Sequence, residues 1–378
     1  MKRILIIGQT DNPGGVETVI KRYYEFLQQD FRMDFMVFTN TCYDEAYFKA
    51  HQSRIVFIKS AQFRHPLAYK KEIHTFFEVN KGIYDVIWFN CCDLANSGYI
   101  MKQAKITGIR KRIIHAHNTQ LMQTGKRRYF YSLMHHYWKN HISRYATDFW
   151  ACSESAGDFF YKAPILKGKA FKIIHNAIET EKYAYDSVTR KQIRETYNLE
   201  NRYVIGHVGR FQFQKNHEFL IDIFYEFLKH HPESILLLVG DGSGRAAIRR
   251  KINRLGISSH VCFTGSRGDV PDLLQAMDVF VFPSHYEGLG ISIVEAQAAG
   301  LPCLISDTIP AECIVTKHLV VRYDLKKTPD AWAEKITSLL HLPRKDRTDE
   351  IRQAGYDLTQ AAEKLETFYA EAKRRNRS

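Results

Sequence analysis

The feature that most constrains the fold is a series of short apolar runs that recurs along the whole chain. Many runs are apolar without interruption, as residues 235–239 are, and strands apolar on both faces belong to parallel sheets covered by helices on each side. Longer stretches with helical periodicity separate the runs, and this alternation predicts doubly wound α/β domains. The runs lie at 3–8, 33–38, 54–58, 85–89, 112–116, 148–152, 171–174, 203–208, 235–239, 260–263, 278–282, 302–306 and 319–322.

A polar, charged stretch between Ala177 and Tyr203 interrupts this series and predicts a domain boundary. The chain of 378 residues is long enough for two domains. We therefore expect two Rossmann-like domains, residues 1–180 and 200–356, which face each other across a cleft. Ligands of such domains bind at the carboxyl ends of the strands. Apolar residues at helical spacing predict one further helix within residues 357–378.

The charge of +13 is unevenly distributed. Residues 1–180 hold 26 Lys and Arg against 15 Asp and Glu, whereas residues 181–378 hold 28 against 26. Residues 94–147 contain ten Lys and Arg and no acid, which favours a partner with phosphate groups, such as an anionic membrane surface. Within this segment, residues 126–145 predict a basic, aromatic, amphipathic helix. Its apolar face either packs on its own sheet or meets anionic lipid.

Other sequence features argue for a cytoplasmic protein. No run reaches the roughly 18 apolar residues that a membrane span needs. The seven cysteines show no Cys-x-x-Cys spacing, and most lie in apolar runs, so we interpret them as reduced core residues. The protein is therefore expected in the cytoplasm, either free or peripheral at the inner face of a membrane.

Two glycine-containing loops follow predicted strands and precede helices. Gly14, Gly15 and Val16 follow the first run, and Gly240 opens a Gly-Asp-Gly-Ser-Gly loop. Glycines let a ligand approach the backbone, and a helix N-terminus favours a phosphate. The alternative is a plain strand-to-helix turn, in the second loop one capped by Asp241 or Ser243.

Charged side chains after two other strands are stronger candidates. Arg210 and Lys215 follow the run at 203–208, where two cations suit a diphosphate. Glu287 and Glu295 follow the run at 278–282, the first in a loop and the second in the first turn of a helix. For Glu295 a capping box with Ser292 is the alternative interpretation.

His115 and His117 lie on the same face of a predicted strand, at its carboxyl end. A metal site needs a third ligand, which the sequence does not reveal, so a hydrogen bond from histidine to substrate is an equal alternative. The chain has no Asp-x-Asp, no Walker A motif and no Gly-x-Ser-x-Gly elbow. We therefore predict no metal and no cofactor, and Arg210 and Lys215 become the expected partners of a diphosphate.

Taken together, these motifs resemble the retaining glycosyltransferases of the GT-B fold, family 4 type, and most closely the bacterial enzymes of capsule and exopolysaccharide assembly. The resemblance spans nearly the whole chain. It rests most on Glu287 and Glu295, spaced as Glu-x7-Glu within Pro-Ser-x-x-Glu-Gly and Glu-Ala-Gln-Ala-Ala-Gly-Leu-Pro. It implies that residues 1–180 lie on the acceptor side, that residues 200–356 bind the nucleotide sugar, and that the last helix crosses back to the first domain.

The resemblance also implies roles for single residues. Arg210 and Lys215 would bind the donor phosphates, Glu295 the ribose hydroxyls and Glu287 the hydroxyls of the donor sugar. The backbone of Gly288, Leu289 and Gly290 would approach the sugar and phosphate, and the loop from Gly265 to Arg267 would approach the base. His117, rather than His115, would lie beside the reacting sugar. Many relatives have proline at the position of Gly290, so added flexibility there leaves the sugar preference open.

The implied reaction transfers a hexose or N-acetylhexosamine from a nucleotide diphosphate sugar, most simply a UDP-sugar, with retention of configuration. The implied acceptor is a glycan or a lipid-diphosphate-linked sugar. The expected mechanism is front-face substitution, in which the protein positions the reactants and stabilises charge. A nucleotide-sugar epimerase, a scaffold without activity and a binder of anionic lipid or nucleic acid are alternatives. Nucleic acid is disfavoured because no recognised module is present.

Overall fold

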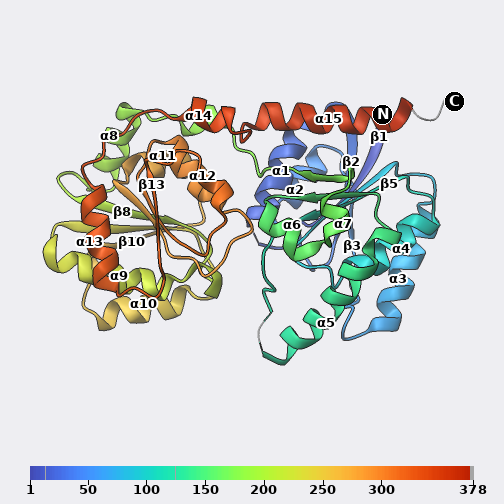
Figure 1. Ribbon diagram of the computed structural model, residues 1–378, viewed down its shortest axis with the longest axis horizontal. Coiled ribbons are helices and arrows are strands. Elements are labelled where there is room, and N and C mark those ends of the chain that lie inside the picture. Colours follow the sequence, from blue (N-terminus) through green and yellow to red (C-terminus); the bar gives the residue numbers. More distant parts are fainter. Residues whose placement is uncertain (13, 124, 375–378) are drawn as a thin grey trace. The chain divides into compact units, whose positions relative to one another are not determined.

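The computed structural model describes residues 1–12, 14–123 and 125–374, and the chain divides into two compact units. The first unit is Met1–Ala177 together with the C-terminal residues from Leu358, and the second is Ile178–Asp357. Figure 1 shows one sheet in each unit. Every run that the sequence predicted as a strand lies in one of these two sheets, which confirms the α/β prediction.

The sheet of the first unit has seven parallel strands in the order β3-β2-β1-β4-β5-β6-β7. This is a doubly wound order: β2 and β3 are added on one side of β1, and β4 to β7 are added on the other. All six residues of β4 are buried, as expected for a strand covered on both faces. The strands are β1 (Lys2–Ile7), β2 (Phe31–Val37), β3 (Ile55–Phe57), β4 (Val86–Cys91), β5 (Lys111–Ala116), β6 (Asp148–Ala151) and β7 (Phe171–Ile173).

The helices of the first unit connect these strands, and the C-terminal helix completes its core. Leu365, Phe368 and Tyr369 of that helix join the cluster that contains Trp88 and Trp150. The apolar periodicity of this helix is therefore explained by packing; residues 375–378 of the stretch in which it was predicted lie outside the described residues. The helices are α1 (Gly15–Leu27), α2 (Glu45–Ala50), α3 (Pro66–Val79), α4 (Ser97–Ile106), α5 (Gly125–His141), α6 (Glu154–Phe160), α7 (Ala163–Leu166) and α15 (Leu358–Arg374).

The second unit repeats the same plan with six parallel strands in the order β10-β9-β8-β11-β12-β13. All six residues of β9 are buried. The strands are β8 (Tyr203–Val208), β9 (Ser234–Val239), β10 (Val261–Gly265), β11 (Val279–Phe282), β12 (Cys303–Ser306) and β13 (Val320–Tyr323). The helices are α8 (Ser187–Thr196), α9 (His217–His230), α10 (Arg245–Arg254), α11 (Val270–Ala276), α12 (Ile291–Ala298), α13 (Pro329–Leu339) and α14 (Thr348–Gln353).

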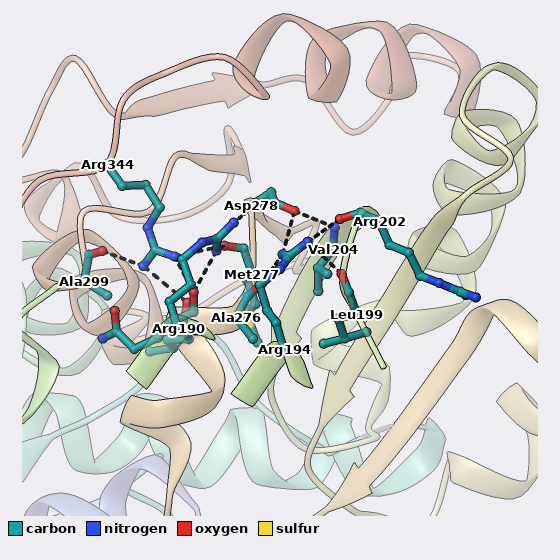
Figure 2. A network of polar contacts seen from close by, with 12 residues as sticks. Arg190, Arg194, Leu199, Arg202, Val204, Ala276, Met277, Asp278, Ala299 and Arg344 are labelled. Carbon is teal, nitrogen blue, oxygen red and sulfur yellow. Dashed lines mark hydrogen bonds and ion pairs between the residues drawn. The ribbon is translucent and has the colours of Figure 1, made fainter. Parts of the chain in front are cut away.

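The sequence predicts residues 181–199 as the link between the two domains. In the structure they are part of the second unit and include α8. No residue of α8 is buried, so this helix is held by polar contacts. Arg190 donates to the carbonyls of Gln275 and Met277, each at 2.8 Å, at the end of α11 (Figure 2). Arg194 donates to the carbonyl of Ala276 at 2.8 Å. The guanidinium groups thereby satisfy carbonyls that a helix C-terminus leaves without partners.

Two further side chains complete this network (Figure 2). Arg344 donates to the carbonyls of Met277 at 2.9 Å and Ala299 at 2.7 Å. Asp278 supplies the negative charge, since it pairs with Arg190 and Arg194 and accepts from the backbone N–H of Val204 at 2.8 Å. Burial lowers the pKa of Arg344 to about 9. A polar cluster therefore joins α8, α11, β8 and the segment before α14.

Helix α5 packs one face on the first unit and exposes another. His135 accepts from the backbone N–H of Leu94 at 3.1 Å and contacts the carbonyl of Phe159 at 3.1 Å. Trp138 lies so close to Gly98 of α4 that a Cβ there would come within 2.0 Å of its ring. The sequence predicted an amphipathic helix over residues 126–145, and the structure has a helix that ends at His141 and carries large apolar side chains that point outward. The exposed ones on this helix are Tyr129 (71%), Phe130 (47%), Leu133 (52%) and Tyr137 (51%).

Candidate functional site

The candidate residues of the first unit lie at the carboxyl ends of β1 and β5. Gly14 caps α1 in an extended conformation, without a side-chain hydrogen bond, and accepts from the backbone N–H of Thr18 at 2.9 Å. A Cβ on Gly15 would meet nothing within 4 Å. Packing within the protein therefore does not explain why position 15 is glycine, and it leaves the backbone there accessible. Val16 packs against the core cluster of the unit.

The two histidines are buried side by side. The ring centroids of His115 and His117 are 4.0 Å apart, and the exposed fractions of the side chains are 0% and 7%. Burial lowers the pKa of His117 to about 3, although the neighbouring Asn176 side chain raises it, and burial lowers the pKa of His115 well below its usual range. Both rings are therefore neutral near pH 7.

In the described part of the chain, these histidines are not part of a cluster of metal-ligand side chains. Among residues 1–12, 14–123 and 125–374, no group of three or more His, Cys, Asp or Glu side chains could hold a metal ion. Nδ1 of His115 accepts from the indole N–H of Trp88 at 3.3 Å. This hydrogen bond from a neutral group occupies one ring nitrogen of His115.

In the second unit, the loop after β8 brings Lys215 to Glu287. The Nζ of Lys215 lies 2.8 Å from Oε1 of Glu287, and the Gln214 amide donates to Oε2 at 3.1 Å. The ammonium group also lies 4.6 Å from the centroid of the Phe282 ring. The side chains of Lys215 and Glu287 are 17% and 7% exposed, so this ion pair is shielded from solvent. Two residues that the sequence placed after separate strands therefore form one charged centre.

The backbone of the β8 loop is fixed by its neighbours. The backbone N–H of His285 donates to the carbonyl of Gln214 at 2.8 Å, and the rings of Phe213 and His285 stack at 4.4 Å. On the other side, the N–H of Phe211 donates to the carbonyl of Asp241 at 3.0 Å. Arg210, in the same loop, is partly buried. The loop is thus held between the loops that follow β9 and β11.

Gly240 is required by this close packing. Its φ is +136°, and a Cβ would lie 2.2 Å from the carbonyl oxygen of Gly209. Its N–H donates to the carbonyl of Gly265 at 2.8 Å, which joins the loops after β9 and β10. Helix α10 begins after Gly244 without a side-chain cap, so the alternative of a turn capped by Asp241 or Ser243 is wrong.

Arg267, in the loop after β10, is exposed and pairs with Asp269, its Nε lying 2.8 Å from Oδ1. Their hydrogen bond and opposite charge raise the pKa of Arg267 above its usual range. The β10 loop thus presents a permanently charged guanidinium group next to the glycine backbone of Gly265.

The loop after β11 and the start of α12 are almost completely buried. Gly290 caps α12 with φ +87°, a conformation that proline cannot adopt. Position 290 is therefore a defined left-handed turn rather than merely a more flexible one. Because Gly290 begins the helix and no side chain caps it, the capping-box interpretation of Ser292 and Glu295 is wrong. Oε1 of Glu295 instead accepts from the hydroxyl of Tyr183 at 2.9 Å.

Three partners of the candidate residues were missed by sequence reasoning. Gln214 holds Glu287, Tyr183 holds Glu295, and Asn90 contacts His117. Gln214 is adjacent to Lys215 and could have been found, whereas the other two are 112 and 27 residues from their partners. Gly288 and Leu289 are buried in the β11 loop, as is Gly290.

Known proteins resemble this chain in sequence. Residues 189–357 match the family described as glycosyl transferases group 1. The chain is 29% identical over 384 residues to the putative glycosyltransferase EpsF of Bacillus subtilis, which covers 97% of this chain and 96% of that protein. It is 26% identical over 208 residues, 52% of this chain and 53% of the relative, to the UDP-Gal:alpha-D-GlcNAc-diphosphoundecaprenol alpha-1,3-galactosyltransferase of Escherichia coli.

The solved structures extend the likeness to the whole fold. The crystal structure of Anabaena HepE in complex with UDP-glucose matches with a TM-score of 0.76 and 19% identity, over 98% of this chain and all of that one. Both units, with their parallel sheets, take part in this match, so the fold is that of the GT-B glycosyltransferases. The match of residues 189–357 to this family model and the similarity to EpsF along the chain together support a glycosyltransferase.

Proposed function

We propose that this protein is a retaining glycosyltransferase that transfers a hexose or N-acetylhexosamine from a UDP-sugar, without a metal ion, in the assembly of a surface polysaccharide. The observation that carries the proposal is the shielded Lys215–Glu287 pair at the carboxyl edge of the second sheet, within the matched domain. Such a centre offers a cation to a phosphate and a carboxylate to sugar hydroxyls.

The roles of the other residues follow from this centre. Lys215 and Arg210 bind the diphosphate and stabilise its charge as the bond to the sugar breaks, a role that needs no metal. Glu287 accepts from hydroxyls of the donor sugar, and Glu295 accepts from those of the ribose. Backbone N–H groups of Gly288 to Gly290 bind near the phosphate, and the loop from Gly265 to Arg267 binds the base.

The chemistry proposed is a front-face substitution at the anomeric carbon. The bond from that carbon to the diphosphate oxygen breaks, the acceptor oxygen bonds on the same face, and the acceptor proton passes to the leaving diphosphate. The protein positions the two substrates and supplies charge, and it forms no covalent intermediate. This fits a site that offers cations and hydrogen-bond acceptors.

Similar proteins support the choice of donor and acceptor. The Anabaena structure holds UDP-glucose, and the Escherichia coli relative is named for transfer from UDP-Gal to a sugar on a diphosphoundecaprenol lipid. We therefore propose a UDP-sugar as the donor and a lipid-diphosphate-linked glycan as the acceptor. The site of action would be the cytoplasm, at the inner face of the membrane that carries such a lipid.

The donor is tested by titrating the protein with UDP-, GDP- and ADP-sugars in the presence of a chelator, and by following their slow hydrolysis. We expect one UDP-sugar to bind and be turned over. Glu295→Ala should weaken its binding about 10- to 100-fold, because hydrogen bonds to a charged group are lost. Glu226→Ala, which removes a carboxylate from a surface pair with Lys229, is the control and should bind as wild type does. Equal binding by both variants would refute the role of Glu295, and binding of no nucleotide sugar would refute the function.

We also propose that the outer face of α5 meets an anionic membrane surface. None of the described helices combines the length and the apolar composition of a membrane span. Tyr129, Phe130 and Leu133 are exposed together with Arg127 and Arg128, an arrangement typical of interfacial helices. The side chain of Lys126 lies outside the described part of the chain.

This surface is tested with vesicles of phosphatidylglycerol and phosphatidylcholine. We expect binding to the anionic vesicles that weakens as salt is added. Replacing Tyr129, Phe130 and Leu133 by serine should reduce it about tenfold or more, since apolar area is lost from the interface. Val79→Ser removes another exposed apolar side chain, 73% exposed on α3, and should change nothing. Equal binding by the triple variant would contradict the proposal.

A further inference from the structure

Asn90 lies at the carboxyl end of β4, between the end of β1 and His117. Its side chain is 2% exposed and makes two hydrogen bonds. The amide Nδ2 donates to the carbonyl of Ile7 at 3.3 Å, and Oδ1 lies 2.9 Å from Nε2 of His117. Three neighbouring strands thus meet at one buried carboxamide.

The Ile7 carbonyl determines which way this carboxamide faces. A carbonyl oxygen can only accept, so the NH₂ group of Asn90 must face Ile7 and its oxygen must face His117. The oxygen can in turn only accept, so Nε2 of His117 must carry the proton. Because the ring is neutral, Nδ1 is then a bare lone pair.

The Asn176 side chain lies beside His117 and interacts with its ring. Among the described residues, however, no hydrogen bond of normal geometry satisfies either Nδ1 of His117 or Oδ1 of Asn176. His117 and Asn176 are each 7% exposed. Each buried acceptor without a donor costs about 1–3 kcal/mol of folding free energy, unless a ligand or a water molecule donates a hydrogen bond to it. A hydroxyl group can donate this hydrogen bond.

Asn90 is itself held in place by Gly8. This glycine has φ +136°, and a Cβ there would lie 2.7 Å from Cβ of Asn90 and 3.0 Å from its carbonyl oxygen. The backbone of β1 therefore approaches β4 as closely as glycine permits, which keeps the Ile7 carbonyl within reach of the amide. Gly8 after β1 and Asn90 at the end of β4 together fix this hydrogen-bonded arrangement.

We propose that Asn90 is a positioning residue that fixes His117 as the Nε2–H tautomer, so that Nδ1 accepts a hydrogen bond from a hydroxyl of the bound sugar. This inference rests on the transferase function proposed above and deepens it. Asn90 touches no substrate and acts through His117. It restricts the ligand at this point to a group that donates hydrogen, and it disfavours a deoxy or O-methyl sugar.

The tautomer is tested on the full chain labelled with ¹⁵N-histidine. The two ring nitrogens of His117, assigned by their loss in His117→Gln, report separately whether each is protonated. Wild type should show a protonated Nε2 and a bare Nδ1. Asn90→Leu removes the acceptor at similar volume, and we expect both tautomers to be populated. Asn90→Asp keeps an acceptor and should keep the wild-type tautomer. Asn80→Leu removes another buried amide of the same unit, 5% exposed, as a control for stability.

Turnover supplies the second measurement. We expect Asn90→Leu to lower kcat about tenfold at nearly unchanged KM, and Asn90→Asp to restore most of it. The inference is overturned if wild-type His117 carries its proton on Nδ1, if Asn90→Leu leaves the tautomer unchanged, or if it lowers kcat no more than Asn80→Leu does. If wild type uses no nucleotide sugar but shows the expected tautomers, the proposed function fails while the role of Asn90 in fixing His117 stands.

Discussion

Replacing Lys215 by methionine is expected to reduce turnover of the sugar donor about 10²- to 10³-fold, the loss typical when one group that stabilises transition-state charge is removed. Methionine keeps an apolar stem over the Phe282 ring but removes the cation that lies 2.8 Å from Glu287. The carboxylate, 7% exposed, would keep the Gln214 amide but lose this charge. The free energy of unfolding should therefore also fall, by about 3–5 kcal/mol.

A double variant separates these two effects. In Lys215→Met with Glu287→Gln no carboxylate remains beside the missing cation, so most of the stability should return, while turnover stays low. Stability is measured by urea unfolding and turnover with the donor identified in the nucleotide-sugar panel. Lys251→Met serves as the control because its partner Asp222 is 40% exposed, and it should cost less than about 1 kcal/mol. Recovery of turnover in the double variant would mean that the pair is only structural.

The second large effect is expected from Asp278→Ala, which should lower the free energy of unfolding of the second unit by about 3–5 kcal/mol. Asp278 pairs with Arg190 and Arg194 and accepts from the N–H of Val204. Its loss leaves these arginines, together with the partly buried Arg344, without that negative charge (Figure 2). The last carbonyls of α11 would still accept hydrogen bonds from the arginines, but these positive charges would then repel one another without a carboxylate between them.

Urea unfolding measures this change, and limited proteolysis shows whether α8, which buries no side chain, becomes accessible first. Asp241→Ala is the matched control. Its ion pair with Arg245 is exposed, with 53% of the aspartate side chain in solvent, and its loss should cost less than about 1 kcal/mol. A cost for Asp278→Ala as small as that of the control would show that the arginines are held by the carbonyls alone.

Much of the fold could be predicted because the relevant signal is local. The strands are nearly continuous apolar runs, and α15 has an apolar stripe that buries Leu365 and Phe368. Helix α8 carries no such signal, since it is attached through Arg190 and Arg194 to carbonyls more than 80 residues away. Its place in the second unit therefore depends on contacts that appear only once the sheet is formed.

The candidate site was predictable to the level of loops but not of partners. Arg210, Lys215 and Glu287 could be placed at strand ends because every strand of a doubly wound sheet ends at the same edge. That Lys215 meets Glu287 requires β8 and β11 to be neighbours, which the order of strands in the sequence does not state. The spacing of Ser292 and Glu295 suggested a capping box, yet the left-handed turn at Gly290 starts the helix earlier.

The order in which the chain is synthesised has a consequence for how the first unit folds. Its strands are complete at Ala177, but the α15 residues that finish its core begin only at Leu358, after the whole second unit. On the ribosome, Ile178–Asp357 can therefore reach its final structure while the first unit still exposes the apolar surface that Leu365, Phe368 and Tyr369 will cover. Synthesis of α15, rather than of β7, is therefore the step that completes the core of the first unit, and truncations within α15 should act chiefly on the unit that was made first.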